Sequence, residues 1–172
     1  IKGQYAPGST FKMVVALAAL EAGIITDSSQ FFCPGHKELG NTKFHCWNKH
    51  GHGRVNVIEA LEQSCDVFFY ELALKTGIHR ISAMSKRFGL GDNTAITIPG
   101  EKSGLIPDKA WKQKHIGEVW TPGETVVASI GQGYVLATPI QLAVMTARIA
   151  QGKNRIKPVM RENEIASDFD PI

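Results

Sequence analysis

The sequence predicts one mainly helical domain with few strands. Its 172 residues, 43% of them hydrophobic, are enough to enclose a single core. Several apolar segments have the length of helices, and each lies between a capping residue or a Pro-Gly break and a closing glycine. Segments that alternate between apolar and polar residues, the pattern typical of half-buried strands, are short and scarce.

Charge and hydropathy limit the classes of partner. The formal net charge is only +3, and no basic run interleaved with aromatic residues indicates nucleic-acid binding, so we expect no nucleic-acid partner. The longest uninterrupted apolar run covers residues 13–20, far fewer than a membrane span needs, and the first residues lack the layout of a signal peptide. If the protein works at a membrane, we expect its anchor to lie outside this chain.

The first expected helix follows a break at Pro7 and Gly8 and ends at Gly23, a residue type that commonly closes helices. Residues 13–20 within it are apolar on every face. Such a helix is typically buried in the middle of a domain.

Ser9 and Lys12 form a candidate nucleophile and base at the start of this helix. Unpaired backbone N–H groups and the positive end of the helix dipole favour negative charge on a serine oxygen there. A spacing of three residues puts the lysine on the same helix face, and a desolvated lysine loses affinity for its proton. The alternative is an N-cap serine followed by a lysine that extends to solvent. Because the apolar run follows Lys12 directly, the pair lies at the edge of a core, which favours the catalytic interpretation.

The segment from residue 24 to residue 54 is rich in Gly, Pro, His and Cys, and we expect it to be rich in loops. Cys33 and Cys46 are close enough in sequence to close a small loop as a disulfide. Cys65 would then be left over as a buried thiol.

A zinc site is an alternative for the same two cysteines. Cys33 and Cys46 would supply thiolate ligands. Candidates to complete the site are Asp27 and the four histidines of the segment, His36, His45, His50 and His52. The spacing matches no standard zinc finger, and a turn held by hydrogen bonds is a third alternative. The sequence therefore requires no cofactor, although zinc is compatible with it.

The next two helices meet at a polar turn. Asn56 and Glu59 have the spacing of a capping box, which opens a short helix that ends near Ser64. A second buried helix begins with Ser64 and Asp66 and ends at Gly77. Ser64 and Asp66 either cap this helix or direct their side chains into a cleft.

The remaining segments are assigned by the same signals. The expected helices are 78–88, 108–114 and 138–152. Val126, Ala128 and Ile130 alternate like a strand, over a run too short to decide between strand and helix. Residues 155–161 are a candidate strand, and residues 162–172 are expected to be loop.

Several stretches of the chain resemble one family. They are Tyr-Ala-Pro-Gly-Ser-Thr-Phe-Lys at 5–12, Ser-Cys-Asp-Val-Phe-Phe-Tyr at 64–70, Ile-Gly-Gln-Gly-Tyr at 130–134 and Ala-Thr-Pro-Ile-Gln-Leu at 137–142. Together they resemble the transpeptidase domain of class B penicillin-binding proteins, nearest to the elongation-specific penicillin-binding protein 2 group. Also similar to that group are Phe-His-Cys-Trp at 44–47, Gly-His-Gly at 51–53 and Trp-Lys-Gln-Lys at 111–114.

The resemblance implies a fold and a set of site residues. The fold is α/β of the penicillin-binding and serine β-lactamase type, of which this chain would be mainly the helical subdomain. Ser9 would be acylated, Lys12 would accept its proton, and Ser64 would relay protons and hydrogen-bond Lys12. Asp66 stands where the second family motif usually has asparagine, and an ionised carboxylate only accepts hydrogen bonds.

The resemblance also implies an activity. Family members acylate the serine with the D-alanyl-D-alanine end of a peptidoglycan stem peptide, release D-alanine and pass the acyl group to an amine on a neighbouring stem. β-Lactams mimic that terminus and stay attached. The expected setting is cell-wall elongation on the periplasmic side of the bacterial inner membrane, with other elongation proteins as partners.

The third family motif, Lys-Thr-Gly on a strand, has one match in this chain, at Lys75-Thr76-Gly77. That match begins nine residues after Asp66. It therefore lies roughly 13 Å along the same helix at ~1.5 Å per residue, and it cannot also be a strand on the opposite side of the cleft. We expect residues 1–172 to be a single partial transpeptidase domain, with the third motif beyond the end of the chain.

Two other interpretations stand beside this one. A class D-like β-lactamase or β-lactam sensor also carries Ser-Thr-Phe-Lys, although residues 64–66 and 131–142 look like the transpeptidases. The second is a non-catalytic folding or interaction unit that keeps the first two motifs without turnover.

Overall fold

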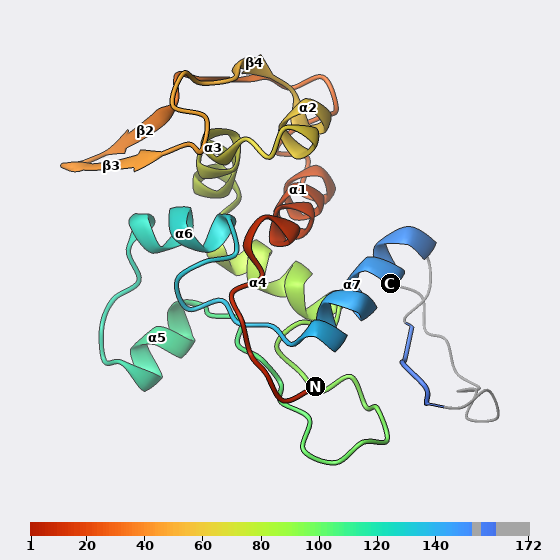
Figure 1. Ribbon diagram of the computed structural model, residues 1–172. Helices are drawn as coiled ribbons and strands as arrows, with labels where there is room; N and C mark the ends of the chain where they lie inside the picture. Colours follow the sequence, from red (N-terminus) through yellow and green to blue (C-terminus); the bar gives the residue numbers. More distant parts are fainter. Residues whose placement is uncertain (153–155, 161–172) are drawn as a thin grey trace.

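The computed structural model describes residues 1–152 and 156–160 (Figure 1). Its helices are the 3₁₀ turn η1 (Gly8–Phe11), α1 (Lys12–Glu21), α2 (Val57–Glu62), α3 (Asp66–Thr76), α4 (Ile78–Arg87), α5 (Lys109–His115), α6 (Pro122–Ser129) and α7 (Pro139–Gln151). Its strands are β1 (Phe31–Cys33), β2 (His36–Leu39), β3 (Thr42–His45) and β4 (Gly53–Val55). Helix therefore dominates the described residues, as the sequence predicts.

Helix α3 is the centre of the molecule. It contacts the helices α1, α2, α4 and α6 and the strands β1, β2 and β3. Phe68 and Phe69, adjacent residues that point in different directions, both have 0% exposed surface. The apolar residues of α3 are enclosed by these elements, while Glu71 and Lys75 keep contact with solvent. The second buried helix predicted from the sequence is confirmed.

Helix α1 is confirmed where the apolar run predicts it. The turn η1 leads into it, and it ends in a Schellman motif in which Ile24 N–H donates to the Ala19 carbonyl and Gly23 N–H to the Leu20 carbonyl. Gly23 has φ +65°, the left-handed conformation that favours glycine at this position. The buried helix therefore starts and stops where its sequence signals lie.

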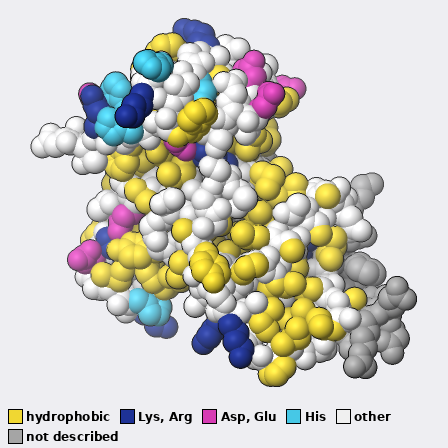
Figure 2. Space-filling model, viewed as in Figure 1, with side chains coloured by type: hydrophobic (Ala, Val, Ile, Leu, Met, Phe, Trp, Pro, Cys, Tyr) yellow, Lys and Arg dark blue, Asp and Glu magenta, His cyan; other side chains and the backbone are white. Residues whose placement is uncertain are grey.

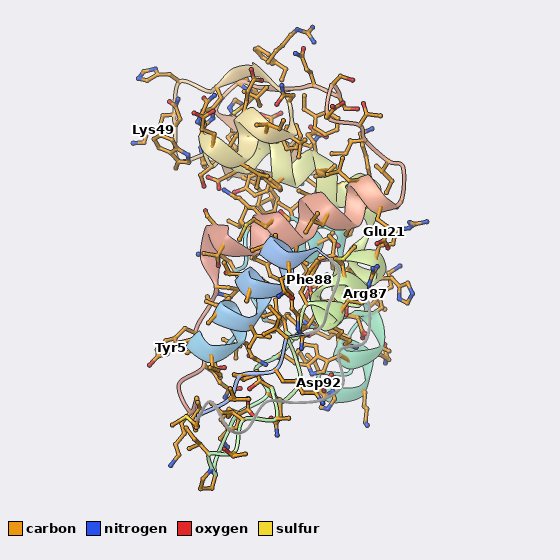
Figure 3. All side chains as sticks on the ribbon, turned by 90° about the vertical axis from the view of Figure 1, so that its right-hand side faces the viewer. Tyr5, Glu21, Lys49, Arg87, Phe88 and Asp92 are labelled. Atoms are coloured by element: carbon orange, nitrogen blue, oxygen red, sulfur yellow. The ribbon has the colours of Figure 1, made fainter. Side chains whose placement is uncertain are left out.

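The C-terminal ends of α1, α4 and α7 meet at one edge of the molecule. Figure 3 shows Glu21 and Arg87 side by side there, and the Arg87 guanidinium binds both Glu21 oxygens at 2.5 and 2.7 Å. Arg148 of α7 donates from Nη1 to the Arg87 carbonyl at 3.1 Å. These contacts join the C-terminal ends of the three helices.

Side-chain caps open most of the remaining helices. Capping boxes are present at α2, with Asn56 and Glu59, and at α7, with Thr138 and Gln141. Asp108 caps α5. The helices expected over 78–88, 108–114 and 138–152 are confirmed as α4, α5 and α7.

Residues 122–129, where strand and helix were both open, form helix α6. Thr121 and Glu124 make a capping box, and Pro122 occupies the first helical position. The apparent alternation of apolar residues reflects one buried helix side packed on α3 rather than a strand.

The loop-rich segment 24–54 also contains strands that the sequence did not predict. The four short strands are paired antiparallel as β1 with β4 and β2 with β3. Each strand has only three or four residues, too few to show an alternating pattern. The two-residue connection Gly40-Asn41 is a turn signal for the β2–β3 hairpin. Lys and His side chains gather on this hairpin (Figure 2), among them His36, Lys37, Lys43 and His45.

The C-terminal predictions fall partly outside the described residues. Residues 156–160 contain no strand, while the other positions of the candidate strand 155–161 and the loop expected at 162–172 lie outside the described part of the chain. Within residues 1–152 and 156–160, no helix combines the length and the apolar character needed to cross a bilayer.

Candidate active site

The four catalytic candidates meet where η1, α1 and α3 converge. The Ser64 hydroxyl donates to Ser9 Oγ at 2.9 Å. Lys12 Nζ donates to Ser64 Oγ at 3.0 Å and to Asp66 Oδ1 at 2.6 Å. Among the described residues no hydrogen bond joins the side chains of Ser9 and Lys12 directly, so the Ser64 hydroxyl links the two side chains. The geometry thus contains the relay position that the resemblance implies for Ser64.

Lys12 is enclosed in the core and does not extend to solvent. Its exposed fraction is 1%, and its Nζ lies 5.6 Å from the centroid of the Phe69 ring. Nζ has three acceptors, Ser64 O at 2.9 Å, Ser64 Oγ and Asp66 Oδ1, which match the three N–H bonds of an ammonium group. The alternative of a lysine that extends to solvent is therefore wrong.

Ser64 has a backbone conformation that non-glycine residues rarely adopt. Its φ is +52°, in the left-handed region, which costs about 1–2 kcal/mol for an L-residue. The N-cap of α3 is Cys65, which makes no side-chain cap, so the interpretation of Ser64 and Asp66 as helix caps is wrong. The left-handed turn directs the Ser64 hydroxyl to Ser9 and Lys12 instead.

Asp66 uses both carboxylate oxygens as acceptors. Oδ1 accepts from Lys12 at 2.6 Å, and Oδ2 accepts from the backbone N–H of Trp47 at 2.9 Å. An asparagine here would place its NH₂ group against one of these two donors. The departure from the usual Ser-x-Asn pattern therefore has a physical reason in this chain: the loop at Trp47 supplies a second donor.

A loop between α6 and α7 forms part of the wall of an open cleft around these groups. The cleft is lined by Gly8, Ser9, Trp47, Ser64, Asp66, Ile130 and Gln132. Gly8 N–H donates to the Gly131 carbonyl at 3.0 Å, and a Cβ at Gly131 would collide with the Gly8 carbonyl oxygen. Gly131 therefore allows the loop to lie directly against the turn that carries Ser9.

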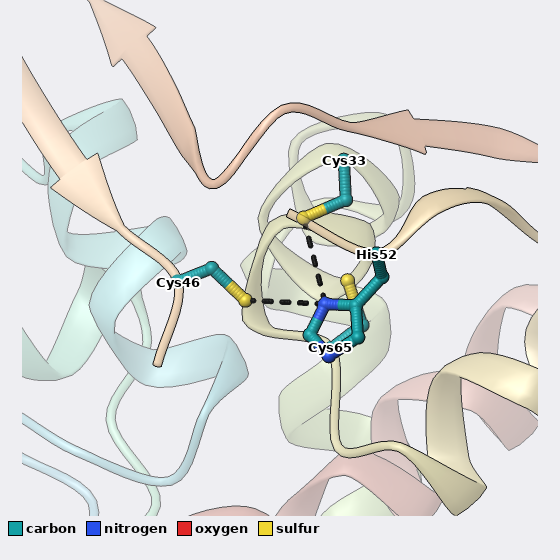
Figure 4. A group of neighbouring side chains, drawn as sticks. All are labelled: Cys33, Cys46, His52 and Cys65. Atoms are coloured by element: carbon teal, nitrogen blue, oxygen red, sulfur yellow. Dashed lines mark hydrogen bonds between the residues drawn. The ribbon is translucent and has the colours of Figure 1, made fainter. Parts of the chain in front are cut away.

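A second group of side chains lies beside the first. Cys33, Cys46, His52 and Cys65 place their ligand atoms within 4.8 Å of one another (Figure 4). We call these four residues the thiol group. All three cysteines are free, so Cys33 and Cys46 do not form the disulfide that the sequence allows. Cys65 is a buried thiol, as expected, but it lies in the same group as the other two. Among the zinc candidates, His52 belongs to the group, whereas Asp27, His36, His45 and His50 lie outside it.

Two distances within the thiol group match the edges of a tetrahedral zinc site. His52 Nδ1 lies 3.6 Å from Cys33 Sγ and 3.5 Å from Cys46 Sγ. With Zn–S near 2.3 Å and Zn–N near 2.05 Å, the S···N edge of a tetrahedron is ~3.6 Å. His52 Nε2 is buried and has no hydrogen-bond partner. Burial raises the pKa of the Cys65 thiol, and the neighbouring Cys33 and Cys46 raise it further, a situation that a bound cation reverses.

Trp47 receives no role from the sequence, and His52 is only one of four histidine candidates for zinc. Both lie in stretches that resemble the family, yet neither has a spacing that singles it out. Trp47 contacts Asp66 and Ser64 across 17 to 19 residues, and His52 meets Cys33 across 19 residues. Only the paired strands and the start of α3 bring them together.

A family model described as "Penicillin binding protein transpeptidase domain" matches residues 1–170. The chain belongs to the penicillin-binding protein transpeptidase family. The predicted fold class and family are therefore confirmed. Within this family, the Lys75-Thr76-Gly77 stretch is confirmed as a helix end, since α3 ends at Thr76, whose buried hydroxyl donates to the Leu72 carbonyl.

Individual family members are similar over nearly the whole chain. Peptidoglycan D,D-transpeptidase MrdA of Escherichia coli K12 is 44% identical over 144 residues, which cover 83% of this chain and 23% of the relative. A crystal structure of Pseudomonas aeruginosa PBP2 in complex with WCK 5153 has a TM-score of 0.93 and 44% identity, covering 99% of this chain and 40% of that one. A complex between PBP2 and MreC from Helicobacter pylori has a TM-score of 0.93 and 36% identity, covering 98% and 31%. The chain thus spans about a quarter of the length of its curated transpeptidase relatives.

Proposed function

We propose that this chain supplies the serine nucleophile and proton relay of a peptidoglycan D,D-transpeptidase. One observation carries the proposal: an unbroken series of hydrogen bonds from Ser9 through Ser64 to Lys12 and Asp66. A serine hydroxyl becomes a nucleophile when its proton has a route to a base, and the relay provides that route. The names of the MrdA relatives supply the substrate class.

In the proposed acylation step, Ser9 Oγ attacks the carbonyl carbon of the penultimate D-alanine of a stem peptide. The Ser9 proton moves to Ser64 Oγ as the Ser64 proton moves to the unprotonated Lys12 amine, which requires the hydroxyls to rotate from the directions described above. A C–O bond forms, the C–N peptide bond breaks, and the leaving D-alanine takes a proton from Lys12 by the same relay. The Ser9 N–H, a first-turn donor without an intrahelical partner, is suited to stabilise the oxyanion.

In the second half of the reaction, an amine of a neighbouring stem attacks the ester. A new C–N bond forms, the C–O bond to Ser9 breaks, and the relay takes a proton from that amine and returns one to Ser9 Oγ. A β-lactam enters the same first step, but its leaving nitrogen stays tethered to the acyl group and blocks the second. Asp66 keeps the Lys12 amine directed at Ser64 throughout.

The setting follows from the relatives. MrdA proteins are named as peptidoglycan transpeptidases, and the solved H. pylori PBP2 is in complex with MreC. By analogy, the full-length protein acts on the periplasmic side of the inner membrane during cell-wall elongation, with an MreC-like protein as a partner.

Intact mass after incubation with a penicillin tests this function. The full-length gene product that contains these residues is expected to gain one adduct that persists for hours, and the Ser9→Ala variant none. Rapid hydrolysis of the adduct would instead support the β-lactamase alternative. A folded wild type that forms no adduct would support the non-catalytic alternative. Release of D-alanine from a stem peptide ending in D-alanyl-D-alanine tests the substrate class.

We propose separately that the thiol group binds one zinc ion. Three thiols and one imidazole are a donor set that zinc prefers, and four protein ligands leave no open position, which is typical of a structural site. Zinc would hold the β1–β4 pair, the loop after β3 and the start of α3 together. Metal analysis of protein purified without chelator is expected to find one zinc per chain, lost in Cys33→Ser. Protein of normal fold with no zinc would refute the site.

A further inference from the structure

Trp47 combines an exposed ring with fully engaged hydrogen-bond donors. Its side chain is 64% exposed at the cleft, yet Nε1–H points to two backbone carbonyls, Ser64 O at 3.0 Å and Gln63 O at 3.1 Å. Its backbone N–H donates to Asp66 Oδ2. The N–H of an exposed indole can donate to water. Here it donates instead to the backbone carbonyls of Gln63 and Ser64, so this contact is a specific feature of the loop that carries Trp47.

The carbonyl that Trp47 binds belongs to the residue in the left-handed conformation. Ser64 O accepts both from Trp47 Nε1, on the cleft side, and from the buried Lys12 Nζ at 2.9 Å. A carbonyl held by two donors cannot rotate without losing one of them. Since φ of Ser64 is +52°, removal of either donor allows the turn to relax toward a common conformation. That relaxation would move the Ser64 hydroxyl away from Ser9.

The position of Trp47 is itself fixed from the other side. It follows Cys46 of the thiol group, and its ring meets the His52 ring edge-on with centroids 5.3 Å apart. The indole therefore joins the thiol group to the turn that carries Ser64.

We propose that Trp47 is a positioning residue that holds Ser64 in the conformation needed to relay the Ser9 proton. This role rests on the proposed function, because only an acylation reaction uses the relay. Trp47 itself need not touch the reacting atoms.

The test compares acylation by a penicillin in the full-length gene product and in Trp47→Phe, which keeps an aromatic ring and the backbone N–H but removes the indole donor. The limiting acylation rate constant is expected to fall about tenfold, the loss of one hydrogen bond of about 1.4 kcal/mol, while penicillin affinity and final adduct stoichiometry stay as in the wild type. Phe32→Leu, which changes a 59% exposed aromatic residue of β1, is the matched control and is expected to leave the rate unchanged.

A second variant removes the donor without changing the shape. β-(Benzothienyl)alanine at position 47 replaces N–H by sulfur, and we expect the same tenfold loss in rate. Wild-type rates in both variants would overturn the proposal. A normal rate constant with less than one adduct per chain would also overturn the proposal, because it would mean that part of the variant protein is misfolded while the folded part reacts as the wild type does. Failure of the wild type to acylate would contradict the proposed function itself, which distinguishes the two failures.

Discussion

The catalytic candidates and the thiol group lie on either side of the first turn of α3, and they differ in how their polar atoms are satisfied. Ser9, Lys12, Ser64 and Asp66 are joined by hydrogen bonds of 2.6 to 3.0 Å. In the thiol group, His52 Nδ1 lies 3.5 and 3.6 Å from two cysteine sulfurs, and the other ring nitrogen, Nε2, is buried with no hydrogen-bond partner. Oxygen and nitrogen groups complete one another as donors and acceptors, whereas thiols and imidazole are better matched to a soft cation.

The two groups are nevertheless continuous in the chain. Cys65 stands between Ser64 and Asp66, and Cys46 is followed by Trp47, which binds both of those residues. A change in one group should therefore reach the other through one or two peptide bonds. We expect the largest losses from substitutions within the two groups and the smallest from a substitution outside them.

Replacement of Lys12 by methionine should cause the largest loss. The change removes the base and leaves Asp66, whose side chain is only 14% exposed, without its cation. We expect the acylation rate with a penicillin to fall about a thousandfold. We also expect the free energy of unfolding to fall by about 3 kcal/mol, measured by urea denaturation.

Lys75→Met is the matched control for this variant. Lys75 lies in α3 too, but it is exposed and belongs to the unused Lys-Thr-Gly stretch. Its acylation rate should equal that of the wild type. A comparable loss at Lys75 would contradict the assignment of the base.

Loss of metal should affect stability first and acylation second. If zinc is present at about a thousand times its dissociation constant, its removal costs about 4 kcal/mol of stability. His52→Ala should therefore lower the melting temperature strongly and abolish the bound zinc, whereas His36→Ala should change neither, since His36 lies outside the thiol group. Equal zinc content in the two variants would show that the ligand set is wrong.

Asp66→Asn should leave one of the two groups that donate to Asp66 without an acceptor. The amide can satisfy Lys12 or Trp47 but not both, and one unsatisfied donor costs about 1–3 kcal/mol. We expect the acylation rate to fall between about fivefold and a hundredfold, measured by stopped-flow with a fluorescent penicillin. Glu71→Gln, farther along the same helix, is the control. An unchanged rate for Asp66→Asn would mean that the Trp47 donor does not matter for the motif.

The smallest effect concerns an ion pair outside both groups, Lys112 with Glu124 of α6, at 2.7 Å. Burial alone would raise the pKa of Glu124, but hydrogen bonds from Lys112 and Thr121 outweigh it, and the net pKa is lowered. The stability from this pair is therefore present above the pKa of the unfolded carboxyl and is lost as pH falls through the folded pKa. Glu124→Gln should flatten stability against pH in the acidic range by less than about 1 kcal/mol, as followed by thermal melts. Glu38→Gln, on the exposed hairpin, should leave the curve unaltered.

Local signals in the sequence predict most of the helices and the placement of Ser9 and Lys12 on one helix face. Caps and closing glycines act within one turn, so Asn56 with Glu59, Thr138 with Gln141, and Gly23 could each be identified without the rest of the chain. Helix α6 had the same signals, a Thr-Pro opening and Glu124 three residues later, but the alternating apolar residues obscured them.

The family motifs gave more information than the local signals, because they imply that Ser64 and Asp66 lie beside Ser9 and Lys12. From the residues alone, however, helix caps are the favoured interpretation of Ser64 and Asp66. The left-handed φ of Ser64 decides between these interpretations, and no sequence pattern specifies that angle for a serine.

The sequence by itself determined the helices, the Ser9–Lys12 spacing and the family, because these depend on residues within a few turns of one another or on long shared motifs. Only the tertiary structure decided how the Ser64 hydroxyl lies between Ser9 and Lys12, that Trp47 donates to Ser64 and Asp66, and that His52 and Cys65 join Cys33 and Cys46 in the thiol group. These contacts join residues as far as 55 positions apart. They form only when α3 is enclosed by the other elements, and that packing is a property of the whole chain rather than of any segment.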